Sequence, residues 1–143
     1  MNATIKPQPK QEQVKLFSEK QVVGTSAVAG IIAGAFLMVI NFYRKGKKQE
    51  AFVCGVVGIV LTVVIALIAI TVPQIPAPVF IVSSYFFAKS WYKNSQAALV
   101  KKHIREGGEI EKIKTVIGFS LIALVINLVI SVGTICAFEF FLN

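Results

Sequence analysis

The sequence predicts an all-α fold, an integral membrane four-helix bundle with a short cytoplasmic amphipathic helical extension. The first observation is composition: of 143 residues, 55% are hydrophobic and 15% are charged, and the mean hydropathy is +0.72. That is too apolar for a soluble domain of this size. The second is that Asp, Glu, Lys and Arg are absent from 21–43, 51–88 and 115–138. A helix crosses ~30 Å of hydrocarbon in about 20 residues, so each stretch is long enough to span a membrane.

The N-terminal part divides into a polar tail and a first span. Residues 1–20 are rich in Lys, Gln, Glu and Pro, which predicts a flexible tail that leads to a helix N-cap at Ser18. The apolar run at 22–43 begins late and is followed by basic residues instead of a cleavage site with small residues. This differs from a signal peptide, so we expect 22–43 to remain as the first transmembrane helix of a domain covering 21–143.

Three prolines, Pro73, Pro76 and Pro78, interrupt the middle apolar stretch. Proline removes a backbone donor and disfavours helix in the residue before it, so we expect a hairpin with spans at 51–72 and 78–95. The second of these is short, although Trp91 and Tyr92 suit the membrane interface. A re-entrant or interfacial third segment is therefore the alternative to a full span.

The remaining residues predict an amphipathic cytoplasmic segment at 96–114 and a fourth span at 115–140. Leu99, Val100, His103 and Ile104 lie on one side of the amphipathic helix, with His103 at its surface, and Gly107-Gly108 ends it. Near the far end of the fourth span, Glu139 is expected to be a solvated carboxylate.

The basic residues predict the orientation. Four lie in the first loop and seven between 89 and 114, so the positive-inside rule places both segments in the cytoplasm and both termini outside. The N-terminal tail, with four Lys against two Glu, has a weak bias of the wrong sign. We attribute the net charge of +8 to contact with anionic lipid head groups, worth ~1 kcal/mol per residue, and not to nucleic acid. The expected lipid contacts are Arg44, Lys45, Lys47, Lys48, Lys101, Lys102 and Arg105.

Three of the expected helices carry a face of small or polar residues. The first has Gly30 and Gly34 in a GxxxG pattern. The second has Gly55 and Gly58 in line with Thr62, Ala66 and Ala69, and the fourth has Ser120, Asn127, Ser131 and Thr134. Small residues let helix backbones approach closely, so we interpret these faces as helix packing. The alternative is a polar stripe that lines a pathway or a partner site.

The sequence offers little catalytic chemistry. An ionisable residue deep inside a span is costly and is retained for a role, but the charge-free stretches 21–43, 51–88 and 115–138 that form the interior of the expected spans contain no Asp, Glu, Lys, Arg or His. The single histidine, His103, has no Cys or Asp nearby in sequence, which argues against a zinc site or a catalytic triad. We therefore predict no enzymatic activity, no metal and no cofactor.

Several short motifs carry a family resemblance. They are Leu16-Phe17-Ser18 followed by Gln21, the Gly30 and Gly34 run, Asn41-Phe42-Tyr43 with Gly46-Lys47, the Pro73 and Pro76 hairpin, and His103 with Gly107-Gly108. With them, most of the chain resembles a family of uncharacterised small bacterial membrane proteins with four predicted transmembrane helices. The resemblance implies a bacterial inner-membrane location. It implies no activity and no functional residues.

The function favoured by the sequence is non-enzymatic. Small size, absent catalytic groups and packing faces predict a protein that acts through helix–helix contact with another membrane protein, in an accessory, assembly or immunity-type role. The alternative is a subunit of a small oligomeric transporter or channel, against which stands the lack of an intramembrane charge that could couple ions to a solute. A membrane enzyme is the weakest of the three. The expected partner is a membrane protein or a second copy of the chain.

Overall fold

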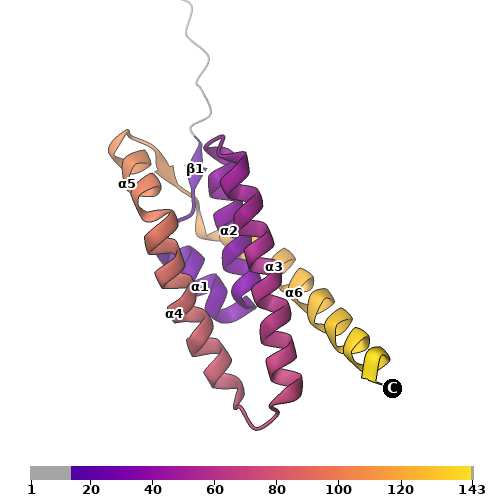
Figure 1. Ribbon diagram of the computed structural model, residues 1–143. Helices are drawn as coiled ribbons and strands as arrows, with labels where there is room; N and C mark the ends of the chain where they lie inside the picture. Colours follow the sequence, from indigo (N-terminus) through magenta and orange to yellow (C-terminus); the bar gives the residue numbers. More distant parts are fainter. Residues whose placement is uncertain (1–13, 143) are drawn as a thin grey trace, which may run out of the picture.

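The computed structural model describes residues 14–142, and within them the chain is all-α apart from two very short strands (Figure 1). The prediction of an all-α protein is therefore confirmed. The elements in chain order are β1 (Lys15–Leu16), α1 (Glu19–Ala29), α2 (Ile31–Arg44), α3 (Lys48–Thr71), α4 (Ala77–Ser95), α5 (Ala97–Arg105), β2 (Glu109–Ile110) and α6 (Ile113–Leu142).

Two of these helices, at Lys48–Thr71 and Ile113–Phe141, are long and apolar enough to cross a membrane. The first, α3, ends just before the proline-rich turn, and α4 follows with extended Pro76 as its N-cap. Pro78 falls in the first turn of α4. Because its missing N–H breaks no hydrogen bond there, the helix can begin at this point. The α3–α4 hairpin thus follows the path expected from the prolines (Figure 1).

The expected single helix at 22–43 is wrong. Gly30 adopts φ 83° and ψ 170°, which ends α1 and starts α2. Glycine reaches this positive φ without steric cost because it has no Cβ. The 14-residue α2 rises only about 21 Å at 1.5 Å per residue. At the far end of α2, the Arg44 guanidinium donates a hydrogen bond of 2.6 Å to the Lys15 carbonyl. Residues 15 and 44 therefore meet at one end of the bundle. The segment between them forms a helical hairpin, α1 and α2, that turns at Gly30 and returns to this end.

The expected flexible tail is also wrong for its last residues. β1 pairs in parallel with β2, Lys15 with Glu109 and Leu16 with Ile110, and both Leu16 and Phe17 are fully buried. The predicted N-cap is present: the Ser18 hydroxyl accepts from the Gln21 N–H while the Gln21 side chain accepts from the Ser18 N–H, a capping box. The first 13 residues of the expected tail lie outside the described residues.

The core lies at the end of the bundle where β1 and β2 pair. Leu37, Met38 and Phe42 of α2 pack there with Tyr92 of α4 and Val100 of α5. His103, expected at the surface, is 6% exposed and lies so close to Gly108 that any Cβ there would overlap its ring. In contrast, the C-terminal half of α6 diverges from α3 (Figure 1), and its apolar side chains are exposed, with Leu128, Val129 and Phe141 at 64%, 66% and 83%.

Candidate functional site

A buried polar cluster fixes the N-terminal strand to the helices. The Asn41 side-chain oxygen accepts a hydrogen bond from the Phe17 N–H at 2.7 Å, and its amide nitrogen donates one to the Phe17 carbonyl at 2.9 Å. The same amide donates to Gln96 at 3.0 Å, and Gln96 donates to the Met38 carbonyl at 2.6 Å. Asn41 and Gln96 are both fully buried. Because a buried polar group without a partner is costly, the closed network holds Phe17 in a single position.

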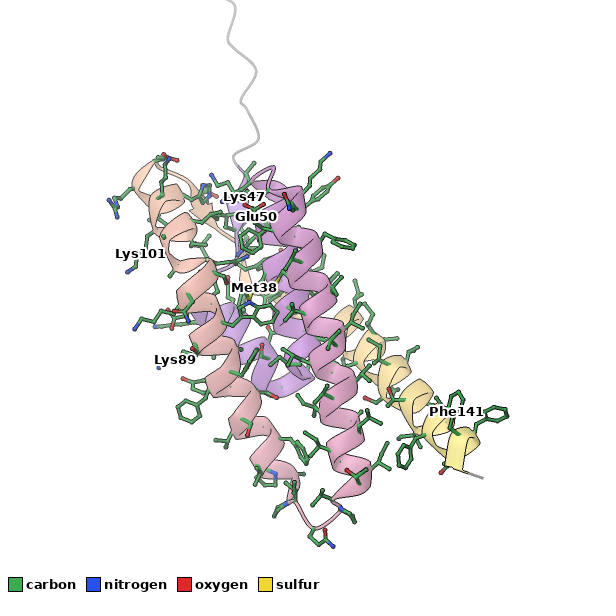
Figure 2. All side chains as sticks on the ribbon, viewed as in Figure 1. Met38, Lys47, Glu50, Lys89, Lys101 and Phe141 are labelled. Atoms are coloured by element: carbon green, nitrogen blue, oxygen red, sulfur yellow. The ribbon has the colours of Figure 1, made fainter. Side chains whose placement is uncertain are left out.

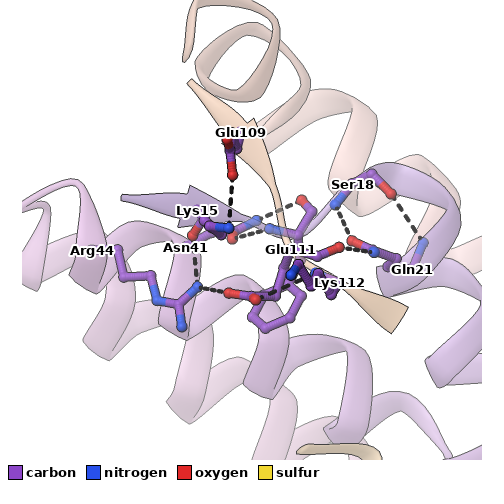
Figure 3. Close-up of polar contacts among 9 residues, drawn as sticks. Lys15, Ser18, Gln21, Asn41, Arg44, Glu109, Glu111 and Lys112 are labelled. Atoms are coloured by element: carbon purple, nitrogen blue, oxygen red, sulfur yellow. Dashed lines mark hydrogen bonds and ion pairs between the residues drawn. The ribbon is translucent and has the colours of Figure 1, made fainter. Parts of the chain in front are cut away.

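Charged residues surround this cluster at the surface (Figure 3). Arg44 forms an ion pair of 2.8 Å with Glu111, and its guanidinium lies 5.4 Å from the centre of the Phe17 ring. Partial burial acts to raise the pKa of Glu111. Hydrogen bonds from Arg44, the Lys112 N–H and Thr115, with the Arg44 charge, outweigh that effect and lower the pKa. The carboxylate therefore stays ionised and ties the start of α6 to the end of α2.

Replacing Asn41 with leucine is expected to lower the free energy of unfolding by about 3 kcal/mol or more. The change leaves the Phe17 N–H and the Gln96 side-chain oxygen without a partner, while the Phe17 carbonyl keeps only the Tyr92 hydroxyl at 3.4 Å. Each unsatisfied buried group costs about 1–3 kcal/mol. Thermal unfolding in mild detergent measures the loss. Asn127→Leu is the matched control, because Asn127 is half-buried and makes no hydrogen bond with the described residues. Equal losses in the two variants would contradict a structural role specific to Asn41.

A cavity of about 430 Å³ lies beyond the turn at Gly30, between the α1–α2 hairpin, α3, α4 and α6. Its polar lining comprises Ser26, Thr62, Ser84, Asn127 and Ser131, and apolar side chains form the rest. Its volume falls in the range of about 300–1,000 Å³ that is typical of small-molecule sites. This cavity is the first of two candidate sites, and the second is the groove between α3 and α6 that contains Gly133.

The structure separates the roles of the glycines that sequence analysis grouped as helix packing. A Cβ on Gly34 would overlap the Ser26 hydroxyl, and one on Gly58 would lie 2.5 Å from the Ala35 Cβ. Gly55 has room, with its nearest neighbour, a Val39 methyl, at 3.6 Å. Gly30 lies at the break between α1 and α2. The interpretation of Gly30 and Gly34 as a continuous GxxxG face of one helix is therefore wrong.

The predicted polar face of the last span divides among three places along α6. The Ser120 hydroxyl lies 3.2 Å from that of Thr25 on α1, whereas Asn127 and Ser131 line the cavity. Thr134 lies in a separate groove between α3 and α6 and hydrogen-bonds to the Ile130 carbonyl of its own helix. Only the middle of this face therefore lines the cavity near Gly30.

The residues predicted to contact lipid lie toward the end opposite the proline turn, as the labelled Lys47 and Lys101 show (Figure 2). The Arg44 guanidinium donates hydrogen bonds to the Lys15 carbonyl and the Glu111 carboxylate, so this side chain stabilises the fold. Lys47 pairs with Glu50 at 3.3 Å and Lys102 with Glu106 at 3.8 Å. Lys48, Lys101 and Arg105 are exposed and Lys45 is half-buried. Contact of these side chains with anionic lipid stays a prediction.

Sequence reasoning missed Gln96 and Ser84. Gln96 lies at the junction of α4 and α5, where a buried glutamine has no local pattern to reveal it. Ser84 reaches the cavity only because α1 packs against α4, a contact between segments far apart in the chain. Within residues 14–142, no three His, Cys, Asp or Glu side chains are grouped so that they could hold a metal ion.

Comparison with known proteins gives no further assignment. The chain matches no protein-family model, no curated protein and no solved structure. The resemblance to a family of small bacterial inner-membrane proteins therefore stays a prediction.

Proposed function

We propose that this chain is an integral membrane protein of the bacterial inner membrane that binds a transmembrane helix of another membrane protein, in an accessory, assembly or immunity-type role. In this proposal α3, α4 and α6 cross the bilayer, and the α1–α2 hairpin enters from the cytoplasmic, basic side and returns to it. The protein acts by binding and has no enzymatic role.

The observation that carries the proposal is the groove between the diverging halves of α3 and α6. It has a volume of about 630 Å³ and is lined mainly by apolar and small residues, among them Val63, Leu67, Gly133 and Ala137. In a bilayer, helices associate mainly through close packing at small residues, because lipid tails are as apolar as leucine. A groove with glycine and alanine on one wall suits the close approach of a further helix.

Gly133 is the residue that makes this groove testable. A Cβ at Gly133 would meet no atom within 4 Å, so the chain's own packing does not require glycine there. Gly118, on the same helix, is equally open but lies outside the groove. The two positions form a matched pair with respect to helix propensity and open surroundings.

Gly133→Leu is therefore expected to leave the protein folded and to abolish capture of its partner, whereas Gly118→Leu should preserve both. Leucine at 133 fills the groove and prevents close backbone approach. The measurement is affinity purification in mild detergent, with a photoreactive residue at position 137 to trap the occupant of the groove, and thermal unfolding to verify the fold. Undiminished capture by Gly133→Leu, or crosslinks only to lipid, would refute the proposal.

A second copy of the chain is the other protein occupant to consider. Mass analysis of the crosslinked product distinguishes the two, because a self-crosslink has twice the mass of the 15.6 kDa chain. If the crosslink is a self-crosslink and is lost with Gly133→Leu, the groove binds a second copy of the chain and the protein is a homo-oligomer.

One observation favours the transporter alternative. Many transporters form substrate sites near mid-membrane from helices that are interrupted there, and the break at Gly30 borders a cavity. Solute flux into liposomes that contain the purified protein would favour this function over the accessory role.

A further inference from the structure

The cavity beyond Gly30 presents hydrogen-bond donors that the chain does not use. No side chain caps the first turn of α2, and the Ala33 N–H is taken by the Gly30 carbonyl at 3.0 Å. The first N–H groups of a helix lack intrahelical partners and point away from the helix along its axis. Because Gly30 and Ile31 both line the cavity, the Ile31 N–H is available to a molecule bound there.

Side chains from two other helices add to this donor set. Ser84 on α4 is only 7% exposed, yet it lines the cavity and its hydroxyl has no hydrogen-bond partner among the described residues. The Asn127 amide stands beside the turn, since a Cβ on Gly30 would lie 2.9 Å from its nitrogen. By contrast, the hydroxyls of Ser26 and Thr62 donate to carbonyls of their own helices at 3.0 and 2.8 Å. The Ser84 hydroxyl therefore opens into the cavity with its hydrogen free to be donated to a ligand.

The remaining lining determines the kind of ligand. None of the described residues around the cavity is Asp, Glu, Lys, Arg or His, so a charged ligand would find no counter-ion at a depth where charge is expensive. Ile65, Ala66, Ile70 and Phe80 offer apolar walls along α3 and α4. The lining therefore suits a molecule with one uncharged oxygen acceptor and a hydrocarbon part.

We propose that this cavity binds an uncharged amphiphile, whose carbonyl oxygen accepts hydrogen bonds from the Ile31 N–H, Ser84 and Asn127, and whose hydrocarbon chain lies against α3 and α4. The site is distinct from the groove between α3 and α6 and goes beyond the proposed helix-binding function. The two can be tested separately, because Gly133→Leu leaves the cavity lining unchanged.

The test uses purified full-length protein in nanodiscs and a photoreactive monoacylglycerol with a 12-carbon chain. We expect crosslinks on α3 and α4 at cavity-lining residues. Unlabelled monoacylglycerol should compete, and dodecane, which lacks an acceptor, should not. Asn127→Leu and Ser84→Ala should each weaken binding roughly fivefold, as expected for the loss of one hydrogen bond, with thermal unfolding nearly unchanged.

Ala66→Phe and Val64→Phe are a matched pair of variants on α3 that add bulk inside and outside the cavity, respectively. Ala66 lines the cavity, whereas Val64 is 43% exposed and lies outside it, so only the first change should abolish crosslinking. If dodecane competed with the probe as strongly as unlabelled monoacylglycerol does, the cavity would be only an apolar crevice. If laurate bound more tightly than monoacylglycerol, the positive N-terminal end of α2 would select an anion. Either result, or equal loss in both phenylalanine variants, would overturn the proposal.

Discussion

Replacing Gly34 with leucine is expected to abolish the folded α1–α2 hairpin. Gly34 lies on α2 where α1 folds back against it, so even a Cβ would overlap the Ser26 hydroxyl and lie 3.2 Å from the Val22 carbonyl oxygen. That hydroxyl is hydrogen-bonded to the same carbonyl at 3.0 Å, and Ser26 is fully buried. Since part of the obstacle is backbone, rotation of one side chain cannot make room for leucine. The two helices must separate.

The measurement is the yield of monodisperse protein in detergent, followed by thermal unfolding of whatever is recovered. Gly118→Leu is the control for the general effect of leucine in place of a helical glycine, and its open surroundings predict normal yield. Gly55→Leu should fall between them, because its nearest neighbour is at ordinary contact distance. If Gly34→Leu gives the yield and melting temperature of Gly118→Leu, the close packing of α1 on α2 is wrong.

The glycine series shows how far sequence reasoning reaches. Spacing along an α-helix placed Gly58 and Thr62 on one side of α3, and both belong to the buried stripe Ala51, Cys54, Gly58 and Thr62, whereas Gly55 of the same predicted face is only half-buried. The same reasoning failed at Gly30, because an apolar run of about 20 residues has the same composition whether it is one helix or two. What ends α1 is a positive φ, and a glycine within an apolar run gives no local sign of it.

The prediction of a flexible tail was wrong for residues 14–18 for a different reason. Residues 14–18 form only a short segment between a polar tail and the first long apolar run. Their fixed position depends on partners 24 to 94 residues away, such as Asn41 for Phe17 and Glu109 for Lys15. Such pairings follow from tertiary packing and leave no periodic pattern. Once the α1–α2 hairpin returns to the end where it began, these partners come within reach, so a hairpin takes the place of the single helix expected at 22–43.

The return of this segment makes the sidedness of the N-terminal strand the sharpest remaining test. The pairing of Lys15 with Glu109 and of its carbonyl with Arg44 places residue 14 at the basic end with Lys47. In a Cys-free background, single cysteines at Val14, Lys47 and Gln74, all exposed, report sidedness through a membrane-impermeant thiol reagent on intact cells. Gln74, in the proline turn beyond α3, should label at once. Val14 and Lys47 should label only after lysis, an all-or-none difference.

A first span crossing the bilayer would instead make Val14 label like Gln74. That result would overturn the hairpin, whereas labelling of Lys47 alone before lysis would contradict the packing of β1 beside the α2–α3 turn.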